Sequence, residues 1–161
     1  MIRPSRGIVL AAALALAASA RPSGQVRGGG NNPQLDLSVS PASISFPGAD
    51  PDVTPIIAAA PVVVTVRVRQ NTSTWTLTVL AGGDLIDGPS TVDISNVSWT
   101  ATPAPPYQNG TLSKTVAQRL ASGTGNVNPA QNGSVTFRLA NAWTYSAGNY
   151  TQTLVFTLSS P

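Results

Sequence analysis

The chain of 161 residues contains no Cys and no His, and its six acidic residues are all Asp. Without Cys there is no disulfide framework, and without Cys or His the usual ligands of structural zinc are missing. The same absences remove thiol nucleophiles, Ser-His-Asp triads and His-based proton transfer. The sequence therefore predicts a protein that is not an enzyme and that uses no cofactor or metal.

Charge is scarce as well, at 9% of residues, against about 25% in an ordinary soluble protein. The formal net charge of +3 includes Arg3 and Arg6, which lie in a segment that we expect to be removed. The remaining basic residues are scattered, with no aromatic-interleaved stripe of the kind that follows a phosphate backbone. We therefore expect no nucleic-acid partner.

Residues 1–20 have the order of regions that is typical of a secretory signal peptide. A positively charged start is followed by an apolar run over residues 8–18 and by the small-residue site Ala18-Ser19-Ala20. The run is shorter than the roughly 20 apolar residues that a membrane-spanning helix needs. We expect cleavage after Ala20, a secreted protein located at the cell surface or outside the cell, and no membrane span in the mature chain. The alternative is an uncleaved N-terminal anchor.

Residues 21–33 read RPSGQVRGGGNNP, which offers almost no apolar surface to bury, so we expect a flexible leader. From residue 34 to residue 161, apolar and polar residues alternate with the period of two that is typical of strands. Segment 111–120 fits either a helical turn or a strand, whereas segments 62–69 and 75–80 resemble the two arms of a hairpin. The other expected strands are 35–46, 92–99, 135–139 and 150–158.

Many short strands separated by turn residues favour a single all-β domain over residues 34–161. We expect an antiparallel β-sandwich of Ig-like or Greek-key type with about seven to nine strands.

The first expected strand is interrupted by Pro41, which cannot donate a hydrogen bond to a sheet. A Pro-rich segment, residues 47–61, separates this strand from the next and could span a gap between subunits. Residues 35–46 are therefore a candidate assembly strand for a filament, although the same interruption fits a first strand that passes from one sheet to the other. Its apolar residues are Leu35, Leu37, Val39, Ile44 and Phe46.

Two stretches carry a family resemblance. Trp75-Thr76-Leu77 matches a Trp-x-Leu motif, and the C-terminal run contains Tyr150 followed by Phe156-Thr157-Leu158. Together they resemble the WxL-type surface domain of bacterial cell walls, in which the second motif is also Trp-x-Leu, so Phe156 departs from the pattern. The resemblance implies an exported, non-catalytic protein that associates non-covalently with the cell wall, with other surface proteins or with itself. Trp75, Leu77, Tyr150, Phe156 and Leu158 fit a sandwich core equally well.

A second function fits the aromatic residues outside this motif. Exposed aromatic rings can stack on sugars, so the chain could be a binding module for cell-wall carbohydrate such as peptidoglycan. The candidate platform residues are Trp99, Tyr107, Trp143 and Tyr145.

Asp84, Asp87 and Asp93 lie close together in a Gly-containing stretch and could be imagined as calcium ligands. No complete calcium-loop motif is present. Turn residues that bond to nearby backbone N–H groups are the favoured interpretation.

Overall fold

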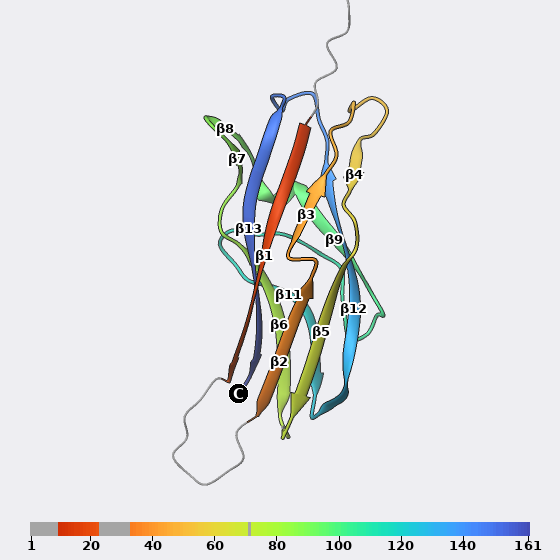
Figure 1. The fold of residues 1–161 in the computed structure, drawn as a ribbon, viewed down its shortest axis with the longest axis vertical. Coiled ribbons are helices and arrows are strands. Elements are labelled where there is room, and N and C mark those ends of the chain that lie inside the picture. Colours follow the sequence, from red (N-terminus) through yellow and green to blue (C-terminus); the bar gives the residue numbers. More distant parts are fainter. Residues whose placement is uncertain (1–9, 23–32, 71) are drawn as a thin grey trace, which may run out of the picture.

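The computed structural model describes residues 10–22, 33–70 and 72–161. The described residues form two β-sheets that face each other, with one short 3-10 turn at Ile94–Asn96 (Figure 1). No helix in this part of the chain is long and apolar enough to cross a membrane. The leader, expected over residues 21–33, lies largely outside the described residues.

The first sheet, sheet A, has the strand order β11-β6-β13-β1-β3, with a small hairpin of β7 and β8 joined to β13. Its strand pairs are antiparallel except that of β1 with β13, which is parallel. Its strands are β1 (Leu10–Pro22), β3 (Ser43–Phe46), β6 (Thr74–Ala81), β7 (Leu85–Asp87), β8 (Ser90–Val92), β11 (Gln118–Thr124) and β13 (Gly148–Ser160).

The second sheet, sheet B, has the order β10-β9-β12-β5-β2, with β4 also paired with β12. All of its pairs are antiparallel. Its strands are β2 (Gln34–Ser40), β4 (Ile56–Ala58), β5 (Val62–Arg69), β9 (Val97–Thr102), β10 (Gly110–Thr111) and β12 (Val127–Ala140).

The described residues thus contain thirteen strands, more than the seven to nine expected. Four of them, β4, β7, β8 and β10, have only two or three residues. Segments this short cannot display a period of two, which is why the alternation did not indicate them. The ambiguous segment 111–120 contains no helix and contributes to β10 and β11.

The expected hairpin of segments 62–69 and 75–80 is wrong. Both segments are strands, but β5 lies in sheet B and β6 in sheet A, so the connection crosses from one sheet to the other. Alternation shows which residues of a strand face the core, but it does not show which sheet the strand joins.

The core lies between the sheets and is made by the inward faces of the alternating strands. On β5, Val62, Val64, Val66 and Val68 are all buried, while Val63 on the opposite face is exposed. The residues of the Trp-x-Leu resemblance are buried too: Trp75, Leu77, Tyr150, Phe156 and Leu158.

Three buried aromatic rings lie against a Gly on another part of the sandwich. A Cβ atom built on any of these glycines would come within 2.4 to 2.7 Å of a ring carbon, closer than real Cβ contacts. The missing side chain is therefore what makes room for each ring. The pairs are Trp75 with Gly123, Trp99 with Gly110, and Tyr107 with Gly133.

Tyr107 should make the folded protein less stable at alkaline pH. Its hydroxyl is buried and shares its one proton between the carbonyl oxygens of Val64, at 3.0 Å, and Gln131, at 3.2 Å. Burial raises the pKa of Tyr107 to about 12, against about 10 in an unfolded chain. The unfolded state therefore loses this proton first, and the contribution of Tyr107 to stability falls as pH rises from about 10 to about 12.

We expect the titration of Tyr107 to lower the free energy of unfolding by up to about 3 kcal/mol between pH values of about 10 and about 12. Urea denaturation at pH 9, 10 and 11 checks it, with Tyr107→Phe as the control that lacks the titrating proton. Parallel pH profiles for the two proteins would contradict the assignment.

Candidate functional site: the position of strand β1

The most unusual feature of the sandwich is the strand between β3 and β13. Strand β1 pairs in parallel with β13 from Leu10 opposite Gly148 to Pro22 opposite Ser160. On its other side it pairs antiparallel with β3, from Ala12 opposite Phe46 to Ala15 opposite Ser43 (Figure 1). Among the described strands, β3 pairs with β1 alone, so β1 joins β3 to the rest of sheet A.

The inward face of β1 completes the core. Ala12 and Leu14 are buried, and Leu16 is partly buried against the core. In the register, Ala12 lies between Phe46 and Tyr150, both of which are buried. The Leu16 N–H also donates to the Ala42 carbonyl at 2.8 Å, just before β3 begins.

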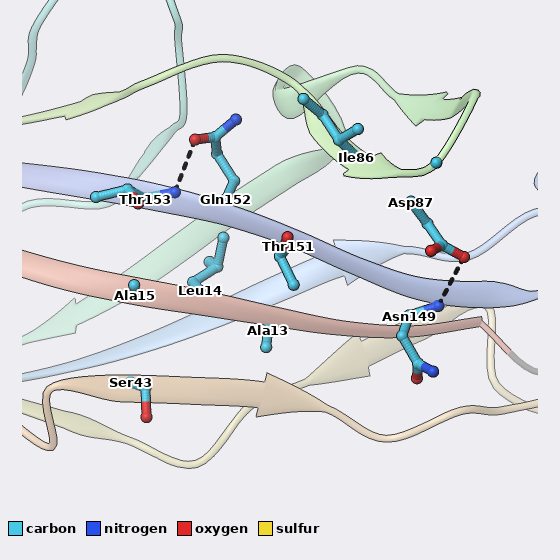
Figure 2. Close-up of a pocket in the computed structure, with 11 residues that line it drawn as sticks. Ala13, Leu14, Ala15, Ser43, Ile86, Asp87, Asn149, Thr151, Gln152 and Thr153 are labelled. Carbon is cyan, nitrogen blue, oxygen red and sulfur yellow. Dashed lines mark hydrogen bonds between the residues drawn. The ribbon is translucent and has the colours of Figure 1, made fainter.

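The outward face of β1 lines an open groove of about 630 Å³ on sheet A. In Figure 2, Ala13 and Ala15 lie on β1 below Thr151 and Thr153 of β13, with Ile86 of the β7–β8 hairpin above them. The walls are small, polar or aliphatic. Asp87 is the one carboxylate among the described lining residues, and it accepts a hydrogen bond from the Asn149 N–H at 3.0 Å.

Strand β1 contacts β3 and β13 through backbone pairing and apolar side chains, so its position is suited to binding a strand. The sequence predicts an export signal over residues 1–20, and residues 1–9 lie outside the described part of the chain. Residues 10–22 form a strand that is not among those expected from the sequence. The one signal that could have indicated it is the alternate spacing of Ala12, Leu14 and Leu16.

The candidate assembly strand, residues 35–46, lies within its own sandwich. Residues 34–40 form β2, which pairs with β5 over seven positions at the edge of sheet B. After Pro41 the chain crosses to sheet A and forms β3, where Ile44 and Phe46 are buried. Leu35, Leu37 and Val39 are partly buried and pack against the core. The arrangement is the passage between sheets that the sequence left open as the alternative.

The four candidate platform residues do not form one surface. Trp99 and Tyr107 are buried, so their rings cannot stack on a sugar, and this part of the prediction is wrong. Trp99 shares the inward face of β9 with Val97 and Ala101. Trp143 is 46% exposed and donates its indole N–H to Asp52 at 2.8 Å. Tyr145 is partly buried against the core.

The three clustered Asp residues each have a partner in the protein. Asp84 forms an ion pair with Lys114 at 2.6 Å and accepts from the Ile94 N–H at 3.0 Å. Asp93 lies 3.6 Å from Lys114 and accepts from the Ser95 N–H, whereas Asp87 bonds to β13 as described above. The hydrogen bond with Asp84 raises the pKa of Lys114.

Hydrogen bonds from Ser95 lower the pKa of Asp93. Within the described residues, no group of three or more Asp, Glu, His or Cys is placed to hold a metal ion.

Comparison with known proteins gives only distant likenesses. No family model matches the chain, and no curated protein matches it. A crystal structure of a point mutant of CfaE, the CFA/I adhesin of enterotoxigenic E. coli, is similar at 8% identity and a TM-score of 0.25. The likeness covers 96% of this chain and 49% of the adhesin chain, so this chain spans about half its length.

The yeast delta-COP-I mu-homology domain, solved with a Dsl1 WxWxV peptide, is similar at 7% identity and a TM-score of 0.22. That likeness covers 73% of this chain and 60% of the other. Neither is close enough to carry an argument.

Proposed function

We propose that this protein is an exported, non-enzymatic structural component of the bacterial cell surface or extracellular matrix. Residues 1–20 would serve as its export signal, and the mature chain would be a β-sandwich of Ig-like or Greek-key type. It would associate non-covalently with other surface proteins or with copies of itself, including as a filament subunit.

One observation carries this proposal: the segment with the features of an export signal occupies an internal strand position of sheet A. Cleavage after Ala20 would remove residues 10–20 of β1 and expose the facing edges of β3 and β13. Unpaired strand edges next to an apolar core favour pairing with another chain. A domain completed in this way is suited to assembly.

The proposed location at the bacterial cell surface rests on the resemblance to WxL-type surface domains. That resemblance rests on Trp75-Thr76-Leu77 and on the C-terminal run through Leu158. Since these side chains are buried, their role would be to hold the sandwich together.

The export step is tested by mass spectrometry of the protein recovered outside a producing bacterium. We expect an N-terminus at or near Arg21. Recovery of an intact Met1 in the extracellular fraction would contradict export by cleavage.

A second candidate function is binding of cell-wall carbohydrate, favoured by Trp143. Its ring is half exposed and is held by the bond between the indole N–H and Asp52, and ordered exposed aromatic rings suit sugar stacking. If this function holds, Trp143→Ala would abolish cosedimentation with purified peptidoglycan. Equal retention of Trp143→Ala and the unaltered protein would exclude Trp143 as the platform.

A further inference from the structure

We propose that the mature protein accepts a strand from a different protein between β3 and β13, in the position that β1 occupies here. This position is called the β1 slot below. The inference rests on the proposed export step, because the slot is vacant only once residues 1–20 have been removed.

Removal of β1 would expose two strand edges and part of the core. Sheet A would lose the strand that connects β3 to β13, and the backbone groups of both edges would lose their partners. The buried Phe46 and Ile44 on one side, and Tyr150 and Leu154 on the other, would lose the cover of Ala12, Leu14 and Leu16. Unpaired buried backbone groups and exposed apolar side chains are both unfavourable, so a replacement strand would stabilise the domain.

Strand β1 itself shows which side chains a strand in the slot needs. At the Ala12 position the strand is flanked by Phe46 and Tyr150, so a small apolar side chain fits there. The Leu14 position is fully buried, and the Leu16 position is partly buried opposite Leu154. A fitting strand therefore has a small apolar residue followed by two larger apolar residues at alternate positions, with small or polar residues between them.

The mature chain itself does not supply such a strand at its N-terminus. The mature leader, residues 21–33, contains Val26 as its one large aliphatic residue, so it does not have this pattern. Residues 34–46 are already engaged as β2 and β3, and exchanging them between copies would still leave the slot vacant. A second copy thus has no fitting strand at its mature N-terminus, and we infer that a different protein supplies it, running parallel to β13 as β1 does.

The test uses the exported mature protein and a synthetic peptide with the sequence of residues 10–22, carrying a solubilising Lys tag. We expect one peptide to bind per protein molecule. When the free peptide concentration is about a hundred times the Kd, the Tm of the protein should rise by about 10 °C. Leu14→Asp in the peptide should weaken binding at least about a hundredfold, because it places a charge in the core. The matched control is Ala15→Asp, which puts the same charge on the exposed face and should bind nearly as well.

Register is checked by disulfide formation, for which the absence of native Cys leaves a clean background. A peptide with Ala13→Cys should cross-link to protein with Ser45→Cys, since these positions are paired across β1 and β3. It should not cross-link to protein with Thr124→Cys, an exposed position on β11.

The outcomes separate this inference from the proposed function. An exported protein that begins at Arg21 but neither binds nor cross-links the peptide would overturn the slot and leave export intact. Retention of residues 10–20 after export would overturn both. Sedimentation of the purified mature protein alone as an ordered polymer would show that a second copy fills the slot, and would overturn the assignment to a different protein.

Discussion

Replacing Trp75 with Ala is expected to lower the free energy of unfolding by about 3–5 kcal/mol, enough to unfold a domain of ordinary stability. Trp75 is only 3% exposed and lies on β6, between β11 and β13, with Gly123 against its ring. Removing the ring leaves a cavity that the flanking strands can close only partly, so lost burial and lost packing add together.

Thermal and urea denaturation of the purified protein measure this loss. Trp143→Ala provides the matched control, because the same ring is removed at a site that is 46% exposed. We expect a change of about 0.5 kcal/mol or less there. A Tm change of only a degree or two for Trp75→Ala would show that Trp75 is not a core residue in solution.

The buried Trp75 and Trp99 differ in the hydrogen bonding of their indole N–H groups. The Trp99 N–H donates to the Gln108 carbonyl at 2.9 Å, whereas the buried Trp75 N–H has no hydrogen-bond partner among the described residues. Trp75→Phe therefore removes an unsatisfied donor, and we expect it to be better tolerated than Trp99→Phe.

The sequence predicts the core faces well because strand periodicity is a local property. The inward residues of β5 alternate with Val63, Thr65 and Arg67, and every inward Val of that strand is buried. The same reasoning separates the two Trp residues that the platform prediction grouped together. Trp99 lies on the same face of β9 as Val97, while Trp143 lies between β12 and β13 in a segment without alternation.

The partners of each strand are a non-local property, and here the sequence is insufficient. The crossing between β5 and β6 follows a turn in which Gln70 has a φ of 55°, and nothing in the residues before it distinguishes this turn from a hairpin turn. The passage of β2 into β3 was easier to anticipate, because Pro41 has no N–H to donate.

The strand position of β1 could not be predicted from the sequence for a different reason. An export signal needs a short apolar run with small residues, and an inner strand needs small or apolar residues at alternate positions. The Ala-rich and Leu-rich stretch from residue 10 to residue 18 meets both needs. The spacing of Ala12, Leu14 and Leu16 is compatible with a strand, and the pairing with β3 and β13 shows where that strand lies.

Replacing Gly133 with Ala is expected to destabilise the domain by about 1–3 kcal/mol, although Ala generally favours a strand more than Gly does. The added Cβ would lie 2.4 Å from the Cζ atom of the Tyr107 ring. That ring cannot easily move away, because its hydroxyl is bonded to the carbonyl oxygens of Val64 and Gln131 on β5 and β12.

A double-mutant cycle with Tyr107→Leu tests whether the ring is the cause. Tyr107→Leu alone should be destabilising, since it removes a buried ring and the hydroxyl that donates to two carbonyl oxygens. In that background, however, Gly133→Ala meets no ring, so the double variant should be more stable than the sum of the single changes implies. We expect a coupling free energy of about 1–3 kcal/mol from urea denaturation. Additive effects would mean that the cost of Gly133→Ala arises from the β12 backbone, and that the contact between Tyr107 and Gly133 does not constrain the sandwich.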